Sequence, residues 1–258
     1  MIALVKNELI KVYARMGYIL AAFVAVSAFA MAPIYATFEG ASGASYLHNL
    51  GGNLGIVNFF TILIAGTILN SELTKGTIKL LLLRPYSRIK IILSKIGAIL
   101  INSLFLSALL FVSVLVASFI FFDQANIFTP VQEFGGQSAL AAAIISILGN
   151  ILLTLFYIVL MLMLSVLFRS QAVSISVGLV LLFSGFIINI FTEMLFENYH
   201  HILQWNPFNV LNFREKLAGT PVIEIGSLSA TQMGMALATY TVIMFLATAF
   251  MFRRMDIG

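Results

Sequence analysis

The chain has 258 residues, of which 61% are hydrophobic and only 9% are charged. Soluble domains carry about 25% charged residues, so this composition argues against a cytosolic enzyme, a nucleic-acid-binding domain and a disordered regulator. Cysteine is absent, which excludes disulfides and thiolate metal sites. The sequence therefore predicts an all-α integral membrane protein, which would fold as a single transmembrane domain over residues 1–258.

Six apolar stretches approach or exceed the length of about 20 residues that a membrane-spanning helix needs. They are Tyr18–Thr37, Leu54–Leu69, Ile96–Phe122, Leu140–Phe168, Val173–Phe191 and Met233–Phe252. The second stretch is the shortest, and we expect it to extend at both ends. The residues between the fourth and fifth stretches, Arg169–Ala172, predict a tight hairpin.

The basic residues predict the orientation in the membrane, because Lys and Arg accumulate in cytoplasmic loops. Twelve of the 14 fall on one side of the six spans, namely Lys6, Lys11, Arg15, Lys75, Lys79, Arg84, Arg88, Lys90, Lys95, Arg169, Arg253 and Arg254. The other side holds Arg214 and Lys216. We therefore expect both termini in the cytoplasm.

Residues 1–16 predict an amphipathic helix on the cytoplasmic membrane surface, with apolar residues at helical spacing. The apolar positions are Leu4, Val5, Leu9, Val12, Tyr13 and Met16. An alternative is a signal peptide, because Ala28–Ala30 resembles a cleavage site. Cleavage would leave five spans, but the basic region is long for a signal peptide and contains Glu8.

The segment 70–95 between the second and third spans predicts a short helix between two hinges. Gly76 ends the helix that leaves the second span, Thr77 caps a new one, and Pro85 stops it near Arg84. Ser87 then caps the helix that leads into the third span. The leucines at 80–83 would be costly in water, so they need lipid or a protein partner. The alternative is an ordinary connecting loop with positive-inside charge.

The external segment 192–232 is too long for a simple turn. Trp205 and Pro207 suit an interfacial position, and Phe213–Lys216 suits a surface helical turn. His200 and His201 are adjacent, so on a helix they point apart, and solvated histidines are favoured over a metal site.

The spans contain amides and hydroxyls but no acidic residue at depth, which argues against a proton-coupled pump. Asn58, Asn102, Asn150 and Asn189 are interpreted as polar contacts between helices, with a pathway-lining role as the alternative. The sequence contains neither a His-Glu-x-x-His motif nor a phosphate loop. If ATP drives this protein, another chain must bind it.

These features resemble the ABC-2 type permeases, the transmembrane subunits of ATP-binding-cassette exporters, and most of all the small bacterial permeases of bacitracin-resistance, lantibiotic-immunity and sodium-export systems. The resemblance covers the whole chain. It rests on the amphipathic start Leu4–Leu9, the six spans, the long last external loop and one pattern after the second span. That pattern is Glu72-x-x-x-Gly76-Thr77, then Leu81-Leu82-Leu83-x-Pro85-x-Ser87-Arg88, with Lys95 before the third span.

The resemblance implies an exporter of an antibiotic peptide, drug, lipid-like amphiphile or ion across the bacterial plasma membrane. It implies a coupling helix that docks on the ATP-binding subunit and transmits motion to the spans. The implied coupling residues are Glu72, Gly76, Thr77, Leu80, Leu81, Arg84, Pro85, Ser87 and Arg88.

The resemblance also implies the composition of the complex and the role of the external segment. Two ATP-binding subunits with ATP and Mg²⁺, a second permease chain (a homodimer favoured over a heterodimer) and membrane lipids would be its partners, without nucleic acid. Segment 192–232 resembles the family's re-entrant external helices. The alternatives are a self-sufficient channel or secondary transporter, and a membrane scaffold or sensor that regulates an ATPase.

Overall fold

The computed structural model describes residues 1–74, 87–122, 126–128, 136–196, 199–219 and 225–254, and every regular element within them is helical. The long helices are α2 (Tyr18–Tyr35), α4 (Gly55–Thr74), α6 (Arg88–Phe121), α7 (Ala139–Phe168), α8 (Gln171–Leu195) and α12 (Ala230–Arg254). The short elements are α1 (Ile2–Val12), α3 (Gly43–Tyr46), α9 (His200–Leu203), α10 (Pro207–Val210), α11 (Phe213–Leu217) and the π-helices η1 (Tyr13–Gly17) and η2 (Leu47–Gly51).

The long helices confirm that the chain is an all-α, multi-pass membrane protein. Five helical stretches in the described residues are long and apolar enough to cross a membrane, and a bent pair in α8 makes a sixth. The second stretch runs over Gly43–Glu72, because α3 and η2 lead into α4, so the extension expected at both ends of 54–69 is confirmed. The fifth is not straight: its two halves, Gln171–Gly185 and Ile187–Leu195, meet at 50°.

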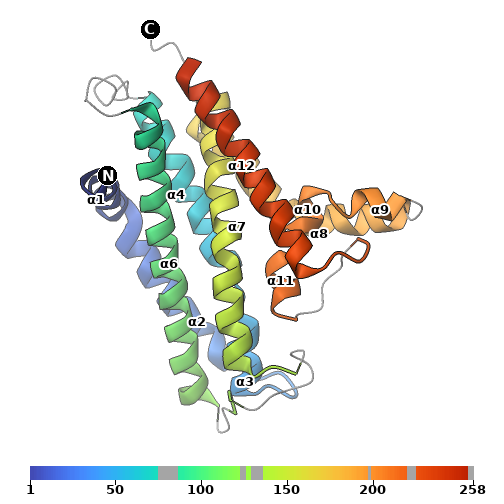
Figure 1. Cartoon of the computed structure of the whole chain (residues 1–258). Coiled ribbons are helices and arrows are strands. Elements are labelled where there is room, and N and C mark those ends of the chain that lie inside the picture. Colours follow the sequence, from blue (N-terminus) through green and yellow to red (C-terminus); the bar gives the residue numbers. More distant parts are fainter. Residues whose placement is uncertain (75–86, 123–125, 129–135, 197–198, 220–224, 255–258) are drawn as a thin grey trace.

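Helix α7 lies at the centre of the bundle, with α4, α6, α8 and α12 packed around it (Figure 1). Its residues Ile158 and Met161 are fully buried. One apolar cluster joins α7 to α4 and α12, and a second joins α2, α3 and α6. Because lipid tails are as apolar as leucine, such helices associate through close packing and hydrogen bonds rather than through the hydrophobic effect.

Helix ends follow the local sequence signals. The Ser87 hydroxyl accepts a hydrogen bond from Lys90 N at the start of α6, which confirms the predicted cap. Ser138 caps α7 in the same way. Arg169 ends α7 in the left-handed conformation at φ 51°, and α8 begins at Gln171. The predicted tight hairpin is therefore confirmed.

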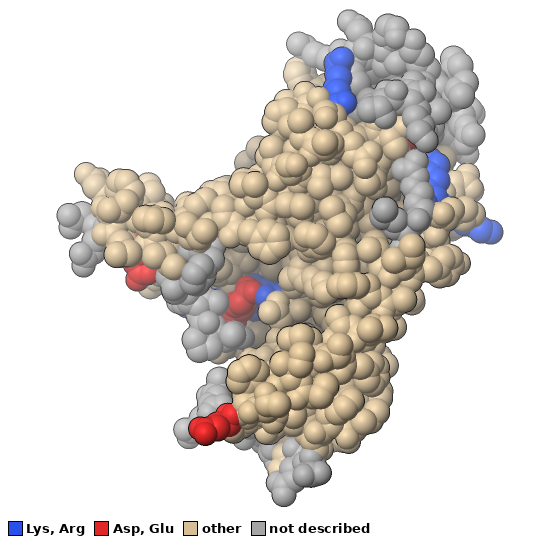
Figure 2. Space-filling view, turned by 180° about the vertical axis from the view of Figure 1, so that it is seen from behind, with Lys and Arg blue, Asp and Glu red and all other residues tan. Residues whose placement is uncertain are grey.

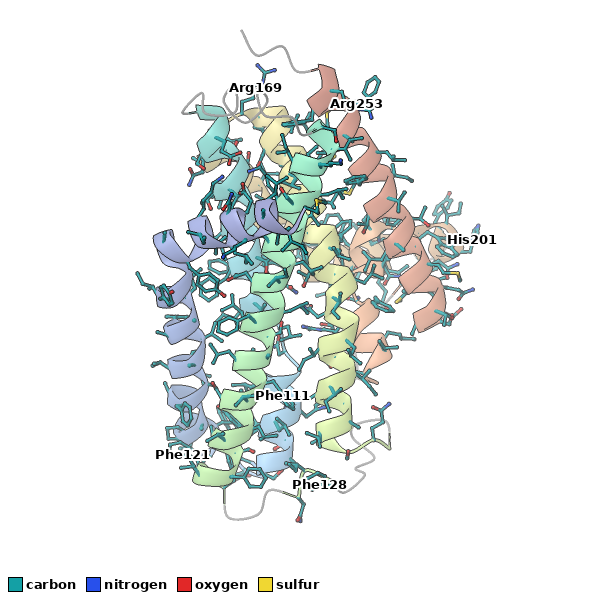
Figure 3. All side chains as sticks on the ribbon, turned by 60° about the vertical axis from the view of Figure 1, so that its left-hand side comes forward. Phe111, Phe121, Phe128, Arg169, His201 and Arg253 are labelled. Atoms are coloured by element: carbon teal, nitrogen blue, oxygen red, sulfur yellow. The ribbon has the colours of Figure 1, made fainter. Side chains whose placement is uncertain are left out.

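The amino-terminal helix α1 runs across the bundle rather than along it, and η1 turns the chain into α2 (Figure 3). Leu4, Glu8 and Val12, spaced four residues apart, are the buried residues of α1, and the helix packs against α6. The predicted amphipathic helix is present, but the centre of its buried stripe is a carboxylate. The apolar residues Val5 and Leu9 flank that stripe and are half-buried.

Arg169 and Arg253 lie at one end of the bundle, and Phe121 and Phe128 lie at the other (Figure 3). The amino-terminal helix α1 and the last described turn of α12 lie toward the first end (Figure 1). Within segment 192–232, the predicted turn at Phe213–Lys216 is present as α11.

The contact of α4 with α7 and α8 depends on the absence of a side chain at Gly66. A Cβ added there would lie 2.5 Å from Ile175 Cγ1 and 2.9 Å from Met161 Cε. We expect Gly66→Ala to lower the thermal unfolding temperature of the detergent-solubilised protein, since overpacking costs about 1–3 kcal/mol. Gly97→Ala is the matched control, because its Cβ would lie 3.6 Å from Val5 Cγ2, an ordinary contact. Equal unfolding temperatures for the two variants would contradict this packing.

Candidate functional site

Four charged side chains form a closed ring at the end of the bundle where α1 crosses it. Glu8 and Lys11 come from α1, Glu72 from α4 and Lys95 from α6. Lys11 Nζ lies 2.7 Å from Glu8 Oε1 and 2.7 Å from Glu72 Oε1. Lys95 Nζ lies 3.2 Å from Glu8 Oε2 and 2.6 Å from Glu72 Oε2. Each lysine thus contacts both carboxylates, and each carboxylate uses one oxygen for each lysine.

Three members of the ring are buried. The side chain of Lys95 is 1% exposed, that of Glu8 5% and that of Glu72 8%, while Lys11 is 46% exposed. An isolated buried charge costs several kcal/mol, and this cost is offset only when partners surround it with good geometry. The ring meets that condition because its two positive and two negative charges alternate and sum to zero.

The ring also sets the protonation of Lys11. Burial by itself lowers the pKa of this ammonium, but the hydrogen bonds with Glu72 and Glu8 outweigh burial, so the pKa lies above its ordinary value of 10.5. A raised lysine pKa contributes stability that is present below 10.5 and is lost as the pH rises through the folded-state pKa. Lys11 is therefore a fixed positive charge at neutral pH.

Two members of the ring stand on either side of segment 75–86, which is predicted to couple the chain to an ATPase. Glu72 precedes residues 75–86, and Lys95 follows them in the first third of α6. Of the predicted coupling residues, Glu72 is in the ring, Ser87 caps α6 and Arg88 is the first residue of α6. The others, Gly76, Thr77, Leu80, Leu81, Arg84 and Pro85, lie outside the described residues.

Sequence reasoning did not assign Glu8, Lys11 and Lys95 to the site. One signal was available: Glu8 stands four residues from both Leu4 and Val12, in line with the buried stripe of α1. A carboxylate at such a position needs a buried cation. Which lysine supplies it depends on how α1 crosses α6, and spacing along the chain does not contain that information.

Asn58 of α4 and Asn150 of α7, predicted as contacts or pathway residues, pair with each other inside the bundle. Asn58 Nδ2 donates to Asn150 Oδ1 at 3.0 Å, and Asn150 Nδ2 donates back to Asn58 Oδ1 at 3.1 Å. Thr154 accepts a further hydrogen bond from Asn150. Both amides are buried, so in this conformation they join α4 to α7. This agrees with their interpretation as polar contacts between spans.

Asn102 and Asn189 are buried as well. Asn102 precedes Ser103 of α6, whose hydroxyl lies 3.0 Å from Thr61 Oγ1 of α4. The Asn189 amide donates to the carbonyl of Phe208, which ties α8 to α10. A pathway-lining role for these amides stays a prediction. In the part of the chain that the structure describes, no three His, Asp or Glu residues stand close enough together to hold a metal ion.

We expect Lys95→Met to destabilise the protein strongly, because both carboxylates then share the single cation Lys11. Removing one partner of a buried ion pair costs about 3–5 kcal/mol. Lys90→Met is the matched control, since Lys90 is an exposed lysine on the same helix and such changes stay within about 0.5 kcal/mol. Thermal unfolding in detergent measures both. Adding Glu8→Gln to Lys95→Met restores neutrality and should recover part of the loss. Unfolding temperatures that do not differ between Lys95→Met and Lys90→Met would show that the ring contributes nothing.

Comparison of the sequence with known proteins assigns the chain to a family. The model of the family described as "Protein of unknown function (DUF2705)" matches residues 5–258. The chain is also similar to the "Uncharacterized protein YhcI" of Bacillus subtilis (strain 168), with 28% identity over 221 residues, which cover 83% of this chain and 69% of that protein. The family match includes Glu8, Glu72 and Lys95 and every long helix. The chain therefore belongs to the DUF2705 family.

Proposed function

We propose that this chain is the permease subunit of an ATP-binding-cassette exporter, driven by ATP that a separate nucleotide-binding subunit hydrolyses. The observation that supports this most is the ion ring, because it joins the helices on both sides of segment 75–86 to α1. A partner that binds this segment would act on α4 and α6 together. The sequence of the segment, with its leucines and Pro85, resembles a coupling helix.

The ring gives such a partner a defined mechanical connection. A buried ion pair resists small displacements, since partial separation leaves charges unpaired in a medium of low dielectric constant. Motion of the segment would therefore move α4, α6 and α1 as one unit. Beyond α1, the π-helix η1 leads into α2, and π-helical turns are frequent at functional sites.

In the proposed complex two permease chains, in the favoured case identical, assemble with two ATP-binding subunits that carry ATP and Mg²⁺. The exported substrate would be a peptide antibiotic, a drug, a lipid-like amphiphile or an ion. The basic end of the bundle would face the cytoplasm of a bacterial plasma membrane. The positions of Arg169 and Arg253 at the same end support this orientation (Figure 3).

The coupling role predicts that the chain captures an ATPase from its native membrane. A mild-detergent pull-down of the tagged chain should recover a phosphate-loop ATPase in near-equal amount, identified by mass spectrometry. Leu81→Asp should abolish this recovery, because a carboxylate on an apolar docking surface costs several kcal/mol when buried. Lys90→Ala, an exposed change next to the segment, is the control. Recovery of the chain alone, with an ATP analogue and a crosslinker present, would instead favour a channel or secondary transporter.

If the ATPase binds to the wild type and to Leu81→Asp equally, the docking segment has been assigned wrongly. If it binds but no substrate is exported by the complex, a scaffold or sensor that regulates the ATPase becomes the better description. These two failures are separate, because the first concerns binding and the second concerns transport.

The orientation can be tested on single-cysteine variants, since the natural chain has no cysteine. We expect a membrane-impermeant maleimide to label Ser227→Cys in intact cells and to label Ser87→Cys only after the membrane is permeabilised. Both serines are exposed, so access through the membrane decides the result. The reverse labelling pattern would place the termini outside.

A further inference from the structure

The short helix α11 is built into the bundle between α7 and α12. A Cβ added at Gly149 of α7 would lie 3.1 Å from Leu217 Cδ2, and one added at Gly234 of α12 would lie 3.0 Å from Phe213 Cε2. Two glycines on two different spans thus make room for the two ends of the same short helix. This close fit places α11 against α7 ten residues after that helix begins.

Asn209 fixes the chain on both sides of α11. Its Nδ2 donates to the carbonyls of Gln204 at 2.7 Å and Ile225 at 3.0 Å, and its Oδ1 accepts from Ile225 N at 2.9 Å. The Asn209 side chain is fully buried, so these hydrogen bonds are protected from water. The position of α11 is therefore set by packing at its two ends and by the hydrogen bonds of Asn209, which join the chain before α11 to the chain after it.

Helix α11 carries a charged pair into this position. The side chain of Arg214 is 11% exposed and that of Glu215 is 24% exposed, and Arg214 Nη2 contacts Glu215 Oε1. Charged side chains packed between apolar helices are expensive in a membrane protein, so this pair is a candidate for a substrate or ion site.

The Arg214 guanidinium has more hydrogen-bonding capacity than the protein uses. A guanidinium carries five N–H donors, and among the described residues its contact is with one carboxylate oxygen, through Nη2. Among the described residues none of its nitrogens is fully enclosed without a partner, so the donors that Glu215 does not use keep some exposure. At the place of α11, Figure 2 shows a hollow with acidic and basic atoms together at its floor.

We propose that this hollow binds a phosphate or carboxylate anion, held by the Arg214 guanidinium. The planar fork of arginine matches the two oxygens of such an anion. Glu215 partly neutralises the arginine while the site is empty, and it competes with the anion for the same donors. The inference is independent of the proposed export role, since it concerns binding by this chain alone.

The helix that carries Arg214 also exposes a large apolar side chain. Leu217, the last residue of α11, is 36% exposed. It offers contact area for a hydrocarbon chain once the headgroup is held by Arg214. The anion can therefore be the headgroup of an amphiphile, or it can be free, and the two sources differ in whether a tail increases affinity.

The experiment uses the purified full-length chain in phosphatidylcholine nanodiscs, with dodecyl phosphate as the probe. Isothermal titration calorimetry gives the Kd, because it needs no reporter group near the site. We expect Arg214→Gln to raise the Kd about tenfold or more, as for loss of a charge-assisted hydrogen bond. Arg169→Gln, at the opposite end of the bundle, should leave the Kd unchanged.

Glu215→Gln provides a test that does not depend on removing the arginine. Because it takes away the competing carboxylate, we expect it to lower the Kd, whereas a merely structural ion pair predicts no gain in affinity. Inorganic phosphate that binds as tightly as dodecyl phosphate supports the site and identifies a free anion as its ligand. Binding of dodecyl phosphate alone, without binding of dodecyl maltoside, supports the site and identifies an amphiphile. A Kd that is the same in the wild type and in Glu215→Gln overturns the proposal, even if Arg214→Gln fails to fold.

Discussion

The arrangement of this protein depends on the cost of placing a charge where water is scarce. Glu8, Glu72 and Lys95 are buried, and each would be expensive alone. Together with Lys11 they form a ring in which every charge meets two of the opposite sign. The ring therefore requires α1, α4 and α6 to keep one relative position, because any one of them leaving would strand charge in the interior.

This requirement explains why α1 lies across the bundle as it does. An amphipathic helix held only by its apolar face can slide or rotate on a membrane surface, since burial of apolar area has no direction. Glu8, in the middle of the buried face of α1, contacts Lys95 of α6 in one register of the two helices. A polar group at the centre of an apolar contact is the device that fixes register in other helical assemblies. Here it fixes the helix that leads into the first span.

The spans themselves were predictable, because composition and length decide them. The cap at Ser87 and the hairpin at Arg169 were predictable from local chemistry within a few residues. The extension of the second span at both ends was predictable too, but the bend in α8 was not, since it depends on how neighbouring elements join. The pairing of Glu8 with Lys95, 87 residues apart, required the crossing geometry of two helices. The sequence pattern included Glu72, but it did not indicate that Glu72 contacts Lys11 and Lys95.

Segment 192–232 also contains features that the sequence could not predict. Its length predicted more than a turn, and Phe213–Lys216 was predicted as helical. What the sequence did not indicate is that Gly149 and Gly234, on spans far apart in the chain, receive that helix. Close approach depends on which helices are neighbours, and a glycine within an apolar run has no distinctive signature. Arg214 and Glu215 therefore looked like ordinary loop charges.

The two charged clusters differ in one physical respect that supports the different roles proposed for them. In the ring each carboxylate uses both oxygens and each lysine meets two partners, so the charges satisfy one another. Such a cluster holds elements in position, and binding anything else would break a contact already made. The Arg214–Glu215 pair is joined through one nitrogen of a group with five donors, and it lies by the hollow seen in Figure 2. A closed network suits transmission of motion between helices, whereas an arginine with unused donors suits recognition of an anion.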